Sequence, residues 1–189
     1  SAQSFFALVL LLEGLSLFVF TSTDVLLFYL FFEATLIPTY FLIVGFGGER
    51  RAYAAVKFLL FSLAGGLIML AAVIGLYVAT ANSSAFTHGS FDFRAVADAV
   101  RYGNLDISPG IANALFGGFM FAFAVKAPLW PLHRWLPDAA VHATPATAVL
   151  MMAVVDKVGT FGMLRYCLEL FPSSAATFRP LIIGLAVIG

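Results

Sequence analysis

The stretch FAFAVKAPLWPLHRWLPDA, residues 121–139, places a lysine at the end of an apolar run and then follows it with prolines. A proline has no N–H and its ring clashes with the preceding turn, so it breaks or kinks a helix. Pro128 is expected to free the carbonyl of Ala124, and Pro131 repeats the loss three residues later. These two prolines predict a helix that breaks at Lys126.

The composition of the whole chain indicates what surrounds that lysine. The chain is 62% hydrophobic and 11% charged, whereas soluble domains are about 45–50% apolar and about 25% charged. A net charge of zero gives no electrostatic bias toward nucleic acid. The single cysteine, Cys167, excludes an internal disulfide framework and argues against a cysteine metal cluster. We therefore expect an all-α, multi-pass membrane protein.

Apolar stretches long enough to cross a bilayer recur along the chain. Such a helix needs about 20 mainly apolar residues. The predicted spans cover residues 5–20, 25–46, 52–79, 109 to at least 126, and 145–170, and a sixth begins at Arg179. A polar segment, residues 80–108, separates the third span from the fourth and includes FDFRAVADAVRYG, which is expected to form a short surface helix. The predicted fold is a transmembrane helix bundle with a broken fourth span.

The basic residues predict how the bundle is oriented, because cytoplasmic loops carry an excess of lysine and arginine. Arg50 and Arg51 place the loop after the second span in the cytoplasm, and Arg134 falls on the same side. The segment 80–108 has more acidic than basic residues, which suits the extracytoplasmic side. Since the chain starts without methionine and ends in an apolar run, we expect it to be a piece of a longer protein.

Ionisable residues lie deep inside four of the predicted spans. They are Glu33, Lys57, Lys126 and Lys157. A charge at the bilayer centre costs about 2.5–3.5 kcal/mol on insertion scales, so such groups usually face a protein interior or a water-filled path. The alternative is that each one forms a structural ion pair between helices. Because both signs occur and prolines accompany two of the four, we favour an ion path.

Two of these residues have a proline close by. Glu33 lies in FFEATLIPTYFLI, residues 31–43, where Pro38 removes the helical partner of the Ala34 carbonyl. Lys126 follows about 17 residues of helix, which at 1.5 Å per residue places it roughly 25 Å into the span. The alternative for Lys126 is a simple helix end whose lysine reaches the membrane interface. The apolar residues that follow it favour the broken helix.

The other candidates are less tightly constrained by the sequence. Lys57 is shallower than Glu33, so the two need a kink or a water molecule to meet. Lys157 lies near the midplane, and the partner of Asp156 is left open because adjacent residues on a helix do not face each other. His133 follows the break and could relay a proton, since its unperturbed pKa is near neutrality.

Four segments resemble, in order, the proton-translocating antiporter-like subunits of NADH:quinone oxidoreductase, respiratory complex I. They are FFEATLIPTYFLI, GGERRAYAAVKFLLFSLAG, FAFAVKAPLWPLHRWLPDA and MMAVVDKVGTFGMLRY. The resemblance covers nearly the whole chain except residues 80–108. Within the family, LIPTYFLI and WPLHRWLPDA look most like the branch called subunit M, a relative of mitochondrial subunit 4.

The resemblance implies a subunit of fourteen helices with two inverted five-helix repeats, of which residues 1–178 would form the first. Residues 179–189 would then begin the next helix. By the same resemblance, Glu33 and Lys126 are the ion pair and the broken-helix lysine of one half-channel. Lys57 would modulate that pair and Lys157 would pass protons toward the centre. Asp156 departs from the apolar residues expected before that lysine.

The resemblance also implies partners, a location and cofactors. Other membrane-arm subunits, including neighbouring antiporter-like subunits, would surround the chain in the lipid bilayer of a bacterial cell (inner) membrane. We expect no cofactor on this chain, with NADH, FMN, iron–sulfur clusters and quinone held by partner subunits, and no nucleic acid. Two alternatives stay open: a subunit of a multisubunit cation/proton antiporter, and a structural membrane subunit with no ion path.

Overall fold

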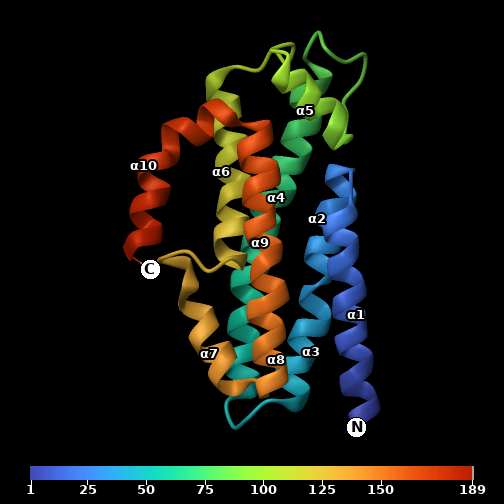
Figure 1. Ribbon diagram of the computed structural model, residues 1–189, viewed down its shortest axis with the longest axis vertical. Coiled ribbons are helices and arrows are strands. Elements are labelled where there is room, and N and C mark those ends of the chain that lie inside the picture. Colours follow the sequence, from blue (N-terminus) through green and yellow to red (C-terminus); the bar gives the residue numbers. More distant parts are fainter. Residues whose placement is uncertain (189) are drawn as a thin grey trace.

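The computed structural model describes residues 1–188, and the described chain is helical throughout apart from its connections. Figure 1 shows the long helices packed side by side along the longest axis of the molecule. The helices are α1 (Ala2–Thr21), α2 (Val25–Ala34), α3 (Leu36–Phe46), α4 (Arg51–Ala81), α5 (Phe93–Arg101), α6 (Pro109–Lys126), η1 (Leu132–Arg134), α7 (Trp135–His142), α8 (Pro145–Leu150), η2 (Met151–Val155), α9 (Asp156–Gly162), η3 (Met163–Leu168) and α10 (Pro172–Ile188).

Within residues 1–188, five helical stretches are long and apolar enough to cross a membrane. They are α1, α2 with α3, α4, α6, and the run from α8 through η3. Consecutive stretches run in opposite directions along the bundle (Figure 1). This arrangement confirms the predicted transmembrane helix bundle.

Side-chain caps explain why several of these helices start where they do. An N-cap oxygen accepts a hydrogen bond from a backbone N–H that has no partner inside the helix. Asp24 does this for α2, Ser108 for α6 and Thr144 for α8. Pro109 and Pro145 follow two of these caps, at a position where the missing N–H is of no consequence.

The polar segment 80–108 contains the predicted surface helix as α5, at one end of the bundle (Figure 1). Backbone bonds fasten the segment to the turn before α2, because Val25 N donates to Phe91 O at 2.8 Å and Phe93 N donates to Thr23 O at 2.9 Å. The apolar side of α5 is buried through Phe93 and Val96. The segment is therefore part of the folded structure.

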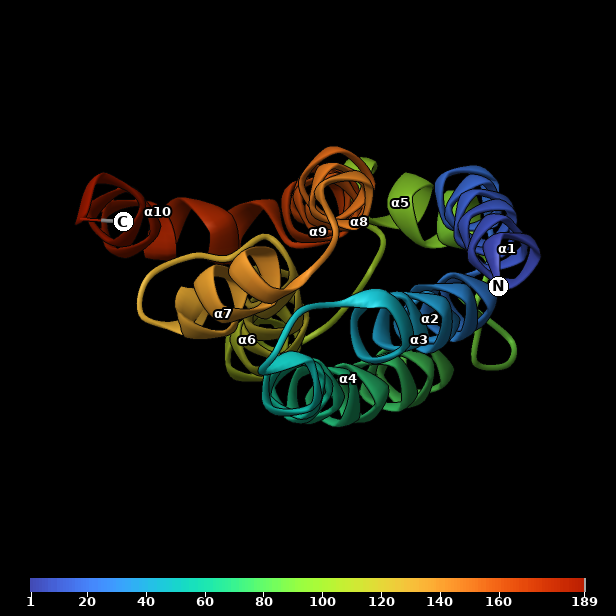
Figure 2. The same cartoon turned by 90° about the horizontal axis from the view of Figure 1, so that it is seen from below.

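The last helix begins earlier than the sequence predicted. We expected it to start at Arg179, but α10 starts at Pro172 and contains Pro180 in its interior. Proline is favoured in the first turn of a helix, and Pro172 provides such a start. Figures 1 and 2 show α10 at the edge of the molecule on the side away from α1.

An aromatic cluster fills the centre of the bundle, between α2, α6 and η3. Phe28 lies 4.3 Å from Tyr166 and 6.0 Å from Phe123, measured between ring centroids. Phe32 and Phe119 extend the cluster along α2 and α6, and all five rings are buried. These rings form the apolar wall of the site described next.

Candidate functional site

The fourth span is broken at its lysine, as the prolines predicted. The helix α6 ends at Lys126, and the chain passes through a cis Trp130–Pro131 bond and η1 before α7 begins at Trp135. In Figure 1, α6 stops part of the way along α4, and α7 continues toward the same end of the bundle. Lys126 is therefore the last helical residue before an irregular connection that begins part of the way along the bundle (Figure 1).

Two carbonyls at the break accept hydrogen bonds from the protein, and for one of them this differs from the prediction. Pro128 was expected to free the carbonyl of Ala124, but the N–H of Leu129 donates to that oxygen at 2.9 Å. The indole Nε1 of Trp135 donates to the carbonyl of Val125 at 2.8 Å. The chain turns back on itself, so an amide one residue beyond the proline replaces the lost donor.

Lys126 is almost completely buried, with 1% of its surface exposed. Its Nζ donates a hydrogen bond of 3.3 Å to the backbone oxygen of Phe32 and lies 4.4 Å from the centroid of the Phe32 ring. A cation over an aromatic ring is attracted by the electrons of the ring face. The lysine thus has a backbone oxygen and a ring as its neighbours at α2.

Glu33 is the next residue after Phe32, close to the point where α2 gives way to α3. Its Oε1 is buried and has no hydrogen-bond partner in the protein. The ion pairs formed within residues 1–188 do not join it to Lys126. The structure therefore places the side chain of Lys126, from α6, against the part of α2 that carries Glu33, without a direct bond between the two side chains.

Two consecutive glycines let α4 approach this place closely. A Cβ added at Gly66 would overlap the carboxylate of Glu33. A Cβ at Gly65 would lie 3.4 Å from atoms of Ala122 and Val125 on α6, which is ordinary van der Waals contact. The glycine pair therefore faces α2 with one residue and α6 with the other. The sequence analysis did not single out either glycine.

Lys57 forms its ion pair elsewhere. Its Nζ donates to Oδ2 of Asp138 on α7 at 2.5 Å and lies 5.7 Å from the ring centroid of Tyr53. This hydrogen bond is the main cause that lowers the pKa of the Asp138 carboxyl. The structure does not bring Lys57 to Glu33, and Asp138 is a partner that the sequence analysis missed. Its position after Pro137, in a short helix following the break, is the signal that could have found it.

Lys157 lies on the outer surface of the described chain. Its side chain is 60% exposed, and its Nζ donates to Oδ2 of the adjacent Asp156 at 2.9 Å. The expectation that these neighbours do not face each other is wrong, because the long lysine side chain bends back to the carboxylate. Gly159 packs against Ala127 at the break. Two residues turn a helix by about 200°, so Lys157 is on the side away from Lys126.

His133 lies on η1, just beyond the break. Its Nδ1 is buried and has no hydrogen-bond partner in the protein. An imidazole nitrogen can accept or donate a proton. The histidine therefore has the capacity that a relay needs, although no hydrogen bond connects it to Lys126 within the described residues.

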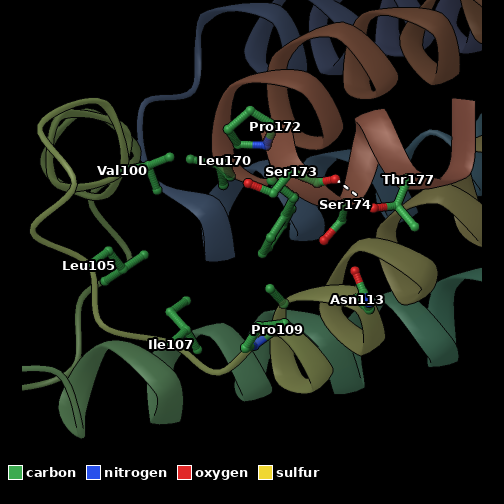
Figure 3. A pocket seen from close by; sticks show the side chains of 12 residues that line it. Val100, Leu105, Ile107, Pro109, Asn113, Leu170, Pro172, Ser173, Ser174 and Thr177 are labelled. Carbon is green, nitrogen blue, oxygen red and sulfur yellow. Dashed lines mark hydrogen bonds between the residues drawn. The ribbon is translucent and has the colours of Figure 1, made fainter.

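A separate hollow of about 310 Å³ lies near the start of α10, between α5, α6 and α10 (Figure 3). Its lining mixes apolar side chains with the polar Asn113, Ser173, Ser174 and Thr177, and the Thr177 hydroxyl donates to the backbone oxygen of Ser173 at 3.0 Å. The residues that line it include no titratable side chain. It is not part of the charged site.

A bundle of apolar helices that buries a lysine at a broken span, next to a glutamate, is typical of membrane transport proteins. Such proteins use helices broken at membrane depth to build ion sites. This chain belongs to the family described as NADH:quinone oxidoreductase/Mrp antiporter, TM, which matches residues 22–189.

Relatives named NADH-quinone oxidoreductase subunit M confirm the resemblance seen in the sequence. The protein of that name from Mycobacterium tuberculosis (strain ATCC 25618 / H37Rv) is 64% identical over 99% of this chain and 34% of its own length. The one from Escherichia coli (strain K12) is 38% identical over 99% of this chain and 36% of its own length. The chain thus spans about a third of the length of these relatives.

Solved structures show the same fold. A chain of respiratory complex I from Thermus thermophilus with bound NADH matches with a TM-score of 0.84 and 36% identity, over 97% of this chain and 37% of that chain. A chain of the Mrp complex from Dietzia sp. DQ12-45-1b matches with a TM-score of 0.73 over 89% of this chain and 30% of that chain. At 21% identity, this second likeness concerns the fold alone.

Proposed function

We propose that this chain is part of a proton-translocating membrane subunit of NADH:quinone oxidoreductase, with protons moving through a buried path coupled to quinone reduction elsewhere in the complex. The observation that carries the proposal is the burial of Lys126 at the end of a broken helix, against the residue that precedes Glu33. Two apolar residues there would stabilise the bundle at lower cost, since buried charge is expensive.

Lys126 is the proton carrier and Glu33 is its counter-charge. An ionised carboxylate nearby favours the charged form of a lysine, whereas burial in an apolar environment disfavours it. A movement of Glu33 toward or away from Lys126 therefore decides whether the lysine holds its proton. The missing direct bond between the two groups leaves the carboxylate free to make this movement.

The remaining candidates extend the path on both sides. Lys57, which is paired with Asp138, modulates the electrostatic potential at Glu33 from the end of the bundle where α7 lies. His133 relays protons near the break, and Lys157 passes them toward the second repeat of the full-length subunit. Residues 1–178 form the first antiporter-like repeat in this proposal.

The proposed setting is a bacterial cell membrane. Partners are other membrane-arm subunits, including neighbouring antiporter-like subunits, and the exposed apolar side chains of the spans face these subunits or lipid. NADH, FMN, iron–sulfur clusters and quinone belong to partner subunits, so the chain itself carries no redox chemistry.

Substitutions of Lys126 in the full-length subunit of the assembled complex test the proposal. Lys126→Met should nearly abolish NADH-driven proton pumping into vesicles. Lys126→Arg keeps the charge but cannot release a proton, so it should block pumping almost as fully. Glu33→Gln, which removes the counter-charge, should also nearly abolish pumping, while Glu33→Asp retains part of it. Pumping is measured with a pH-sensitive dye against the rate of NADH oxidation.

The matched control is Arg94→Gln, which removes an exposed charge on α5 and should leave pumping unchanged. A Lys126→Arg complex that pumps with the wild-type ratio of protons to electrons would show that Lys126 is a fixed counter-charge. Wild-type pumping in both Glu33→Gln and Lys126→Met would favour a structural subunit with no ion path.

A subunit of a multisubunit cation/proton antiporter is the second candidate. The family description names both classes, and the Mrp complex has the same fold. Co-purification separates the two candidates: NADH-oxidising partners support the respiratory complex. Cation-driven proton movement without such partners supports the antiporter.

A further inference from the structure

Ser62 on α4 is a buried serine whose hydroxyl, like that of Tyr166 on η3, has no hydrogen-bond partner in the protein. The serine is 4% exposed. A serine or threonine inside a helix usually donates to the carbonyl three or four residues earlier. Ser16 does so at 2.7 Å, and Thr35, Thr39 and Thr80 make the same kind of bond.

The position of Ser62 on α4 directs it toward the charged site. It precedes Gly65 by three residues and Gly66 by four, and residues at these spacings are neighbours on one helix face. A Cβ added at Gly66 would overlap the Glu33 carboxylate, and one added at Gly65 would meet Val125, the residue before Lys126. Ser62 therefore faces the space where α2, α4 and α6 meet.

The two buried atoms without partners at this place are complementary. Oε1 of Glu33 accepts hydrogen bonds, and the Ser62 hydroxyl can both donate and accept. Buried polar groups in folded proteins nearly always find a partner, in the protein or in an ordered water. A hydrogen bond between the two groups, direct or through one water molecule, would satisfy both atoms at once.

We propose that the Ser62 hydroxyl is the hydrogen-bonding and proton-transfer partner of Glu33 on α4, and that Gly66 is the positioning residue that admits the carboxylate. This inference rests on the proposed function, in which Glu33 is the counter-charge of Lys126, and it adds a protonated state of Glu33 that forms when its charge is not needed to hold the Lys126 proton. When the carboxylate is protonated, the hydroxyl gives its own proton to a Glu33 oxygen and takes a replacement from a hydronium ion on its other side. One O–H bond forms at the carboxylate, the hydronium ion becomes water, and Ser62 is unchanged.

The hydroxyl is tested in the full-length subunit of the assembled complex. Ser62→Ala should reduce NADH-driven pumping several-fold and shift the carbonyl stretching band of Glu33, which is identified in infrared difference spectra by its loss in Glu33→Gln. Ser62→Thr keeps a hydroxyl and should restore both properties in large part. Ser16→Ala removes an equally buried serine whose hydroxyl is bonded within its own helix, and should leave the band and the pumping unchanged.

The glycine pair supplies a second comparison on one helix. Gly66→Ala should displace the carboxylate, shift the Glu33 band and reduce pumping, because a Cβ there overlaps the carboxylate. Gly65→Ala adds a Cβ one residue earlier, where it would make ordinary van der Waals contact with α6. It should change the Glu33 band and the pumping little.

Two results would overturn the inference. One is an unshifted Glu33 band in Ser62→Ala. The other is an equal loss of pumping in Ser62→Ala and Ser62→Thr, which indicates a packing role. If Glu33→Gln itself pumps like the wild type, the proposed function fails; the infrared band still decides whether Ser62 contacts Glu33.

Discussion

The pair of Lys57 and Asp138 links α4 to α7 through partly exposed side chains, so its stability depends on pH in a defined direction. A carboxyl whose pKa is lowered on folding contributes stability above its ordinary pKa, about 3.9, and loses it as the pH falls through the lowered value. Since Lys57 lowers the pKa of Asp138, the pair is complete at neutral pH and is lost only in acid.

Asp138→Asn should therefore speed the hydrogen exchange of the α7 amides at pH 7. The difference in exchange rate between the variant and the wild type should shrink as the pH falls below the ordinary pKa of aspartate. The effect should be small, because solvent screens an exposed pair. Hydrogen exchange of the α7 amides in the assembled complex measures it, with Asp98→Asn on α5 as the control. A difference that grows in acid would contradict the assigned role of the pair.

Individual site residues differed in how far the sequence could predict them. Glu33 and Lys126 stand out because a charge in an apolar run has a large energetic cost wherever the helix packs. The partner of Lys57 did not stand out, because Asp138 is 81 residues away and meets it only after the chain has turned back at the break. Gly66 has no polar group to mark it, and its role depends on the approach of α2.

At the scale of the elements, a side-chain hydrogen bond joins α7 to the end of α6 across the break. The indole of Trp135 is buried and donates to the carbonyl of Val125. Trp135→Phe removes the donor and leaves a buried carbonyl without a partner, which costs about 1–3 kcal/mol. We expect a lower thermal stability of the assembled complex and a reduced pumping rate.

The other tryptophan of the chain provides the control. Trp130 lies in the same connection but is 40% exposed, so Trp130→Phe should change stability much less. Equal losses in the two variants would indicate that ring volume, and not the indole N–H, holds the break.

The elements themselves follow closely from the sequence, and the exceptions have local causes. The two prolines predicted the break, since their effect on a helix depends only on the chain. The rescue of the Ala124 carbonyl by Leu129 depends on the path of the connection, which the prolines alone do not determine. The early start of α10 at Pro172 was missed because a proline can end one helix or begin another.

At the scale of the whole molecule, most of the apolar surface of the spans is unburied. Between 17% and 44% of the apolar window of each span is buried within residues 1–188. Lys157 lies on such a surface, with its side chain 60% exposed. Because lipid alone is an unfavourable neighbour for a charged side chain, this surface is expected to contact further helices of the same assembly.

This arrangement predicts that the 189-residue chain does not conduct protons by itself. The proposed path through Lys126 needs a continuation beyond Lys157, and the chain spans about a third of the length of its relatives. Reconstituted alone in liposomes under a potassium diffusion potential, it should show no proton flux above that of liposomes without protein, measured with an enclosed pH-sensitive dye. The assembled complex with the full-length subunit, energised with NADH in the same liposomes, is the positive control. A saturable flux through the chain alone that Lys126→Met abolishes would show that the described helices already contain a complete path.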